Sequence, residues 1–176
     1  FSGRHVLARL ELALQHLGAQ GPVVMPSFTF STSAHAVHWA GGTPDFAEIR
    51  PEDLTLDPAD AAERVRATGA VAMTATHIYG TPCQVEALQQ VADEAGIPLV
   101  YDAAHALGSS RAGRRVGGFG AAEVFSMSPT KVTTAVEGGL VATHDSDLAA
   151  ALRIGRDYGN PGDYDCVFPG INARMS

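Results

Sequence analysis

The sequence predicts an α/β fold in which a mostly parallel, mixed sheet is flanked by helices. Two observations lead to this fold class. Short apolar runs alternate with amphipathic segments along the chain, and strands that alternate with helices need crossover connections. In addition, 45% of the 176 residues are hydrophobic, which is enough to form one hydrophobic core. We therefore expect a single domain over residues 1–176.

The helices are predicted from apolar residues that recur every three or four positions. From Val6 to Leu17 the leucines follow this spacing, and Gly18 then supplies a stop. Further helices are expected over 31–40, from about Pro58, over 84–95 and over 147–156. The short apolar runs predict strands over 23–25, 45–49, 70–76, 99–103, 123–126 and 140–143.

Composition and charge exclude several classes of protein. The formal net charge of −7 disfavours a nucleic-acid surface, and the basic cluster from Arg111 to Arg115 is interpreted as a solvated turn. The apolar runs are too short to span a bilayer, and no charged leader precedes an apolar core. Cys83 and Cys166 are isolated thiols without metal-type spacing. We expect a cytoplasmic protein with neither nucleic acid nor membrane as partner.

Lys131 is the only lysine in the chain. An amine can lose its proton and form a Schiff base, whereas a guanidinium stays protonated, although a lone lysine fits an ordinary surface position equally well. The run from Phe125 to Lys131 favours the functional interpretation because its hydroxyls follow an apolar strand and suit a phosphate dianion. Ser126 is the candidate phosphate ligand, and its structural alternative is a strand-end turn.

Asp102 ends the apolar run 98–101, which would bury its carboxylate. Burial of a carboxylate is costly unless a cation or hydrogen bonds compensate, and the protonated pyridine nitrogen of pyridoxal phosphate (PLP) is such a cation. The alternative is an Asp that caps a following helix. On a helical turn His105 would share a face with Asp102 and could reach the phenolic oxygen of PLP. Phe30 could stack on the cofactor ring, or be core packing.

Five segments in this order resemble the DegT/DnrJ/StrS family of PLP-dependent sugar aminotransferases, of fold type I. They are residues 26–30, 77–80, 101–108, 125–131 together with 137–139, and 170–176. The resemblance implies a PLP-transferase large domain whose C-terminal small domain is absent from this chain, and both chain ends indicate a fragment of a longer enzyme.

The resemblance also implies a role for each candidate residue. Lys131 would form the Schiff base and transfer protons, Asp102 would bind the pyridine nitrogen, and His105 the phenolic oxygen. Ser126 would bind the phosphate and Phe30 would stack on the ring. A phosphate-binding Asn at the position of Asn172 would come from the neighbouring subunit of a homodimer. The implied substrates are glutamate or glutamine as amino donor, with a nucleotide-linked ketosugar or a keto-cyclitol as acceptor.

Some positions depart from the family pattern. Ser128 stands where His is frequent, Glu48 where Asp is usual, and Ser2-Gly3-Arg4 only loosely matches a Ser-Gly-Thr phosphate turn. Alternative functions are a PLP-dependent sugar dehydratase, in which His replaces the lysine, and an inactive or regulatory PLP-fold scaffold. A nicotinamide-binding domain ranks lower, because no Gly-x-Gly-x-x-Gly follows a strand with an acidic residue at the expected distance.

Overall fold

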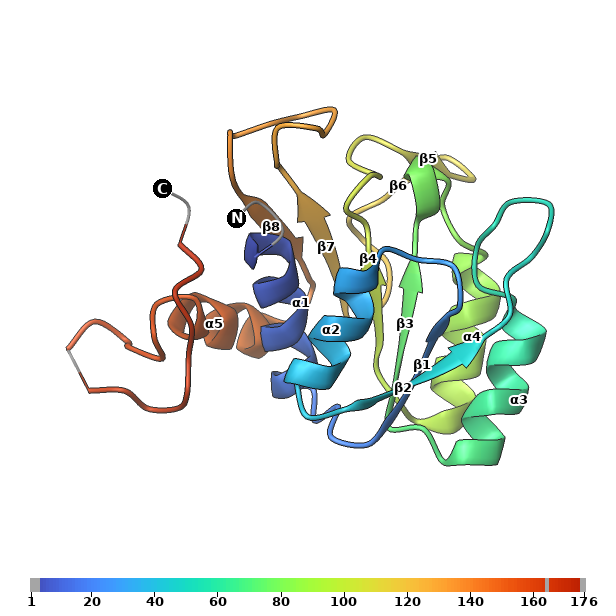
Figure 1. Cartoon of the computed structure of the whole chain (residues 1–176), viewed down its shortest axis with the longest axis horizontal. Helices are drawn as coiled ribbons and strands as arrows, with labels where there is room; N and C mark the ends of the chain where they lie inside the picture. The colour runs from blue at the N-terminus through green and yellow to red at the C-terminus, as the bar shows by residue number, and fades with distance from the viewer. Residues whose placement is uncertain (1–3, 164, 175–176) are drawn as a thin grey trace.

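The computed structural model describes residues 4–163 and 165–174, and a six-stranded sheet forms its centre (Figure 1). The strand order is β2-β1-β3-β4-β7-β8. The strands are β1 (Pro22–Pro26), β2 (Thr43–Ala47), β3 (Ala72–Thr76), β4 (Leu99–Asp102), β7 (Ala122–Ser126) and β8 (Gly139–Ala142). Neighbouring strands are parallel except for β7 and β8, which are antiparallel. The predicted mostly parallel, mixed sheet is confirmed.

Helices cover both faces of this sheet, as the sequence predicted. They are α1 (Arg4–His16), α2 (Ser31–Trp39), α3 (Pro58–Thr68), α4 (Val85–Ala95) and α5 (Ser146–Gly155). Leu10 and Leu14 of α1 share a buried cluster with Val100 and Val124 from the strands. The intervening strand residues, such as Tyr101, pack with α3 and α4 on the other face. The central strands β1, β3, β4 and β7 are therefore buried on both sides, which explains their largely apolar character.

Local signals explain where the helices begin and end. Asp57 caps α3 by accepting the backbone N–H of Ala59 at 2.9 Å, and Pro58 occupies the first turn, where no N–H is needed. Gly69 ends the same helix with a φ of 63°, a conformation that costs glycine little.

The segment around Arg111 differs from the prediction. It is a small hairpin of β5 (Ser110–Arg111) and β6 (Arg114–Arg115), joined by Ala112 and Gly113 with φ values of 48° and 77°. Two successive residues with positive φ match the twist of a tight hairpin. The predicted turn is present, but it connects two paired strands instead of standing alone.

The parallel strands place four loops at one edge of the sheet. The loops after β1, β3, β4 and β7 all leave from carboxyl ends, which lie toward the top of Figure 1. Ligands of open α/β sheets bind at this edge. No helix in the described part of the chain is both long and apolar enough to cross a membrane.

Candidate active site

A cavity of about 480 Å³ lies where these four loops meet. Phe30 lines it from the loop after β1, and Asp102 and His105 line it from the end of β4 and the segment after it. Ser126 and Lys131 line it from the end of β7 and the following loop. Five of the six predicted site residues therefore converge on one cavity, although Phe30 and Lys131 are about a hundred positions apart.

Asp102 is 6% exposed, and both of its carboxylate oxygens accept hydrogen bonds. Oδ2 accepts the hydroxyl of Ser33 at 2.6 Å, and Oδ1 accepts the backbone N–H of Ala104 at 3.0 Å. These two bonds offset part of the cost of burying a carboxylate and fix the plane of the group. The lone pairs that remain can accept a cationic N–H from a ligand in the cavity.

His105 reaches the cavity by a different route from the one predicted. Residues 103–109 form consecutive turns, not a helix, with the N–H of Ala106 bonded to Ala103 O at 2.9 Å and that of Ser109 to Ala106 O at 3.0 Å. The expected helical face shared with Asp102 is therefore wrong. Asp102 and His105 nevertheless line the same cavity. The alternative, in which Asp102 caps a following helix, is also wrong. Its Oδ1 accepts the N–H of Ala104 within a turn, and no helix follows in residues 103–109.

The electrostatics of His105 reflect this position. Burial lowers the pKa of His105, and the nearby positive charge of Lys131 lowers it further, while Asp102 acts in the opposite direction. The imidazole stacks on the ring of Tyr79, with centroids 6.2 Å apart and planes inclined by 10°. At neutral pH His105 is therefore uncharged, with one ring N–H to donate.

Lys131 lies in an irregular loop between β7 and β8 whose ends are held together by backbone hydrogen bonds. The N–H of Met127 bonds to Gly138 O and that of Ala135 to Met127 O, both at 2.9 Å, and the N–H of Lys131 bonds to Ser128 O at 3.0 Å. Ser126 and Ser128 are 5% and 8% exposed, and their hydroxyls lie 3.4 Å apart on the cavity wall. Amine and hydroxyls thus face the same space, as donors suited to an anionic group.

Aromatic rings form the outer rim of the cavity. Phe30 is 68% exposed and Tyr79 70%, and the ring of Phe28 meets that of Tyr79 edge-on at 6.3 Å. Phe30 is therefore not core packing, because its ring faces the cavity. Tyr79 has a φ of 50°, which is strained for a non-glycine residue and is frequent at binding sites.

The contact predicted for Asn172 is not made with the cavity of its own chain. Asn172 is exposed and pairs with Asp157 through an isolated antiparallel bridge, near the end of α5. Ser2 and Gly3 of the loosely matched phosphate turn lie outside the described residues, and Arg4 begins α1.

Several buried or partly buried polar side chains at or next to the cavity were missed by reasoning from the sequence. Ser33 contacts Asp102, and Thr29 and Thr76 bond to each other at 2.8 Å. His77 and Glu123, both with fully buried side chains, bond at 3.0 Å. The sequence offered one signal for these residues, the position of His77 directly after a strand. The bonded partners are distant from one another in the sequence, so no local pattern reveals the pairs.

Cys83 is unsuited to nucleophilic chemistry. Its thiol donates to Thr76 O at 3.1 Å, and burial raises the pKa of the thiol well above its ordinary value. This environment suits a structural thiol.

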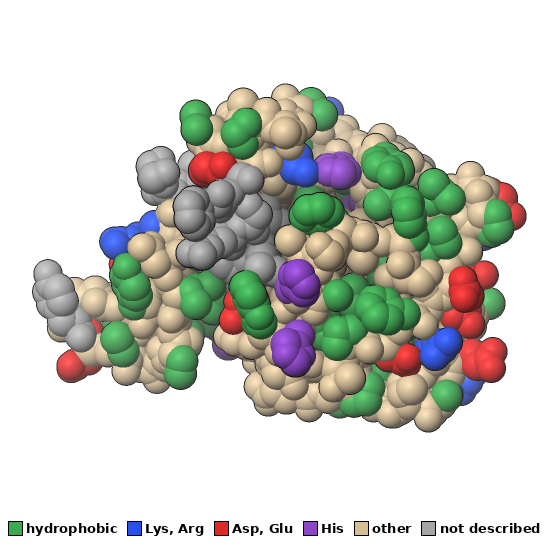
Figure 2. Space-filling view, in the orientation of Figure 1, with side chains coloured by type: hydrophobic (Ala, Val, Ile, Leu, Met, Phe, Trp, Pro, Cys, Tyr) green, Lys and Arg blue, Asp and Glu red, His purple; other side chains and the backbone are tan. Residues whose placement is uncertain are grey.

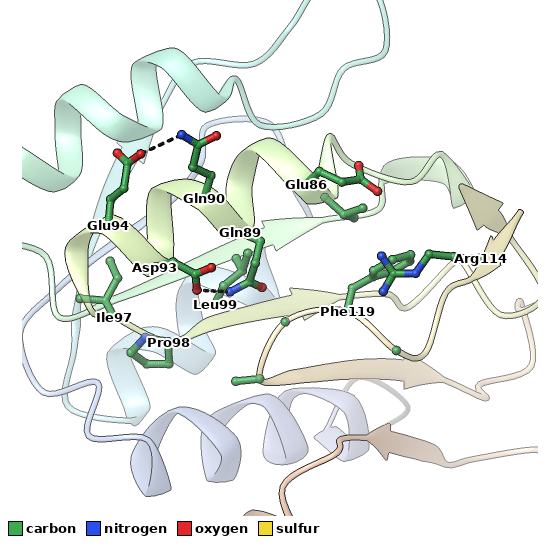
Figure 3. A pocket seen from close by; sticks show the side chains of 14 residues that line it. Glu86, Gln89, Gln90, Asp93, Glu94, Ile97, Pro98, Leu99, Arg114 and Phe119 are labelled. Carbon is green, nitrogen blue, oxygen red and sulfur yellow. Dashed lines mark hydrogen bonds between the residues drawn. The ribbon is translucent and has the colours of Figure 1, made fainter. Parts of the chain in front are cut away.

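A larger groove, of about 680 Å³, runs along α4 (Figure 3). Two of its acidic residues are bonded to amides of the same helix, Asp93 to Gln89 and Glu94 to Gln90, both at 2.8 Å, and Glu86 pairs with Arg111 at 3.3 Å. Arg114 lies over the ring of Phe119, 4.7 Å from its centroid. These polar groups have partners, and no predicted site residue lines the groove, so the smaller cavity is the better candidate for catalysis.

Known proteins resemble this chain over nearly its whole length. A transaminase of Streptomyces venezuelae, dTDP-3-amino-3,4,6-trideoxy-alpha-D-glucose transaminase, is 38% identical over 170 residues, covering 94% of this chain and 44% of that protein. L-glutamine:2-deoxy-scyllo-inosose aminotransferase of Streptomyces kanamyceticus is 40% identical over 147 residues, covering 82% and 34%. The crystal structure of DesI in the presence of its TDP-sugar product matches with a TM-score of 0.89 at 43% identity, covering 97% and 43%.

The chain thus spans less than half the length of the relatives it matches. The DegT/DnrJ/EryC1/StrS aminotransferase family model matches residues 7–176. The chain belongs to this family.

Proposed function

We propose that the protein is a PLP-dependent aminotransferase that transfers an amino group from glutamate or glutamine to a keto-sugar linked to a nucleotide, or to a keto-cyclitol. One observation carries this proposal: Lys131, Asp102, His105, Ser126 and Phe30 line a single cavity. The acceptor class is supported by the relatives, one a transaminase named for a dTDP-linked amino sugar and one an aminotransferase named for a cyclitol ketone.

The side chains in the cavity fit PLP group by group. Asp102 offers a buried anionic oxygen for the pyridine N–H, and the neutral His105 offers an N–H for the phenolic oxygen. Ser126 offers a hydroxyl for the phosphate, and the exposed ring of Phe30 offers a face for stacking. When bound, PLP supplies an electron sink next to the carbon that exchanges the amino group.

Lys131 performs the proton transfers in this proposal. Its amine would hold PLP covalently and, once the donor amino group has replaced it, would be free to take the proton from the α-carbon of the donor. With PLP as electron sink and water for hydrolysis, the donor would leave as its keto acid and the acceptor would gain the amino group. A histidine could not hold the cofactor in this way, and Lys131 therefore favours transamination over dehydration.

We further propose that two copies of the full-length protein complete each site. The rings of Phe28, Phe30 and Tyr79 are exposed around the cavity, and Val132 is 89% and Val136 75% exposed in the Lys131 loop. In Figure 2 apolar side chains are visible along the upper part of the molecule, toward which the carboxyl ends of the parallel strands point in Figure 1. An apolar rim of this kind suits a subunit interface, and Asn172 would then serve the partner's cavity. A monomer in sedimentation experiments on the full-length protein would contradict this assembly.

Cys83 and Cys166 are both free thiols, which suits a compartment with reducing conditions. We therefore propose the cytoplasm as its location.

The function is tested by recording the absorbance of the full-length protein with PLP and then adding glutamate and glutamine separately. We expect a band from the bound cofactor that changes with one of the two donors as the corresponding keto acid is released. Lys131→Ala should lack both the band and the donor response. A band that responds to neither donor would instead support a scaffold without transaminase activity.

A further inference from the structure

A row of hydrogen-bonded hydroxyl groups lies behind Asp102. It begins at Thr76, at the end of β3, whose Oγ1 lies 2.8 Å from that of Thr29 in the loop after β1. Thr29 donates to the hydroxyl of Ser33 in α2 at 3.4 Å. Ser33 then donates to Oδ2 of Asp102 at 2.6 Å. Three elements of the fold thus contribute one hydroxyl each to a row that ends on the carboxylate.

The direction of the protons in this row follows from simple counting. Each hydroxyl has one proton to donate. The proton of Ser33 points to Asp102 and that of Thr29 points to Ser33, so Thr76 must donate to Thr29. All three O–H dipoles therefore point toward Asp102. Hydrogen bonds in such a chain polarise one another, most strongly where water is excluded and the acceptor is charged.

Ser33 acts on the cavity only through Asp102. It is 2% exposed and does not line the cavity, whereas Thr29 and Thr76 do. A serine in the first turn of a helix ordinarily caps that helix or bonds to nearby backbone. Here its hydroxyl instead bonds to a side chain 69 positions away. The contact is therefore tertiary and specific to the carboxylate.

We propose that Ser33, supported by Thr29 and Thr76, is a positioning residue that holds Asp102 as a carboxylate in one orientation toward the pyridine nitrogen of PLP. This role rests on the function proposed above. Without the Ser33 hydroxyl, Oδ2 of Asp102 loses its donor inside the protein. Asp102 then takes a larger share of the proton between it and the pyridine nitrogen, and the cofactor becomes a weaker electron sink.

The test compares Ser33→Ala with two matched variants of the full-length protein. Ser33→Thr keeps a hydroxyl at the same position. Thr74→Val removes a buried hydroxyl from β3 that has no hydrogen-bond partner among the described residues. Affinity for PLP, the pH midpoint of the bound-cofactor absorbance change, and the melting temperature of the cofactor-free protein are measured for each.

We expect Ser33→Ala to bind PLP roughly tenfold or more weakly, since the lost bond is made to a charged group. The pH midpoint should rise by roughly half a unit or more, because the hydrogen bond that favours the charged form of Asp102 is gone. In the steady state kcat should fall more than KM rises. Ser33→Thr should restore the pH midpoint, and Thr74→Val should match the wild type throughout.

If Ser33→Ala does not fold, Thr29→Val shortens the row by two hydroxyls, and a smaller rise of the same midpoint is expected. Wild-type PLP affinity and pH midpoint in Ser33→Ala would overturn the positioning role alone. A wild-type protein that shows no cofactor band would overturn the proposed function, and this role with it.

Discussion

His105 shares the cavity wall with one cationic and one anionic side chain. Its pKa lies below the ordinary value because burial disfavours the imidazolium and Lys131 repels it, and Asp102 only partly compensates. The unfolded chain then binds more protons than the folded one below the ordinary histidine pKa of about 6.5. The contribution of His105 to stability is therefore present above that pH and is lost as the pH falls.

We predict that Lys131→Gln raises the pKa of His105, because the substitution removes a nearby positive charge and leaves most of the burial unchanged. Titration of the imidazole C–H signals by NMR, without cofactor, measures it directly. Arg153→Gln, which removes a cation that does not line the cavity, is the matched control and should leave the titration unchanged. An unchanged His105 pKa in Lys131→Gln would show that the lysine is not close.

The site residues recognised from the sequence carry reactive chemistry at or shortly after the end of an apolar run, and Lys131 is in addition the only lysine of the chain. Lys131, Asp102 and Ser126 were recognised in this way. Ser33 was not, because serine is common in the first turn of a helix and its partner Asp102 is 69 positions away. A contact of that kind depends on the tertiary arrangement, which no local pattern encodes.

The segment after β3 is fixed by a buried side-chain pair. Nδ1 of His77 accepts the N–H of Cys83 at 3.1 Å, so the ring is neutral and donates from Nε2 to Oε1 of Glu123 at 3.0 Å. Oε2 of Glu123 accepts the backbone N–H of Phe119 at 2.9 Å and also that of Gly117. The loop that carries Tyr79 is thereby attached to β7.

Glu123→Gln should destabilise the protein by about 1–3 kcal/mol, because the new NH₂ group must face either the Nε2–H of His77 or the backbone donors. Urea denaturation of the full-length protein measures this free energy of unfolding. Glu86→Gln changes a carboxylate that is 58% exposed beside Arg111, and we expect it to alter stability by less than about 0.5 kcal/mol. Equal effects of the two substitutions would refute the importance of the buried pair.

Helices and buried strands were predictable because burial leaves a pattern in the sequence. The leucines of α1 recur every three or four positions, and β3 and β4 are short runs of mostly apolar residues. The β5–β6 hairpin was not predicted, since strands of two residues are too short to show a pattern. A helical turn was considered only for Asp102 and His105, because their spacing of three residues suits one, and residues 103–109 form consecutive turns instead.

The whole fold explains why residues scattered along the chain act together. Parallel strands deliver Phe30, Asp102 and Lys131 to one edge of the sheet, and helices on both faces bury the strands that carry them. The family resemblance anticipated this arrangement. Asn172 does not line the cavity of its own chain, and its contact with the cavity of a partner subunit remains a prediction that the family resemblance implies.

Covalent trapping tests the central claim most directly. The full-length protein is saturated with PLP, reduced with borohydride and digested, and the peptides are analysed by mass spectrometry. We predict that the added mass of the cofactor is found on the peptide that contains Lys131, and that Lys131→Arg yields no adduct on that peptide. An adduct on a different residue, or none in the wild type, would contradict the assignment of this cavity as the active site.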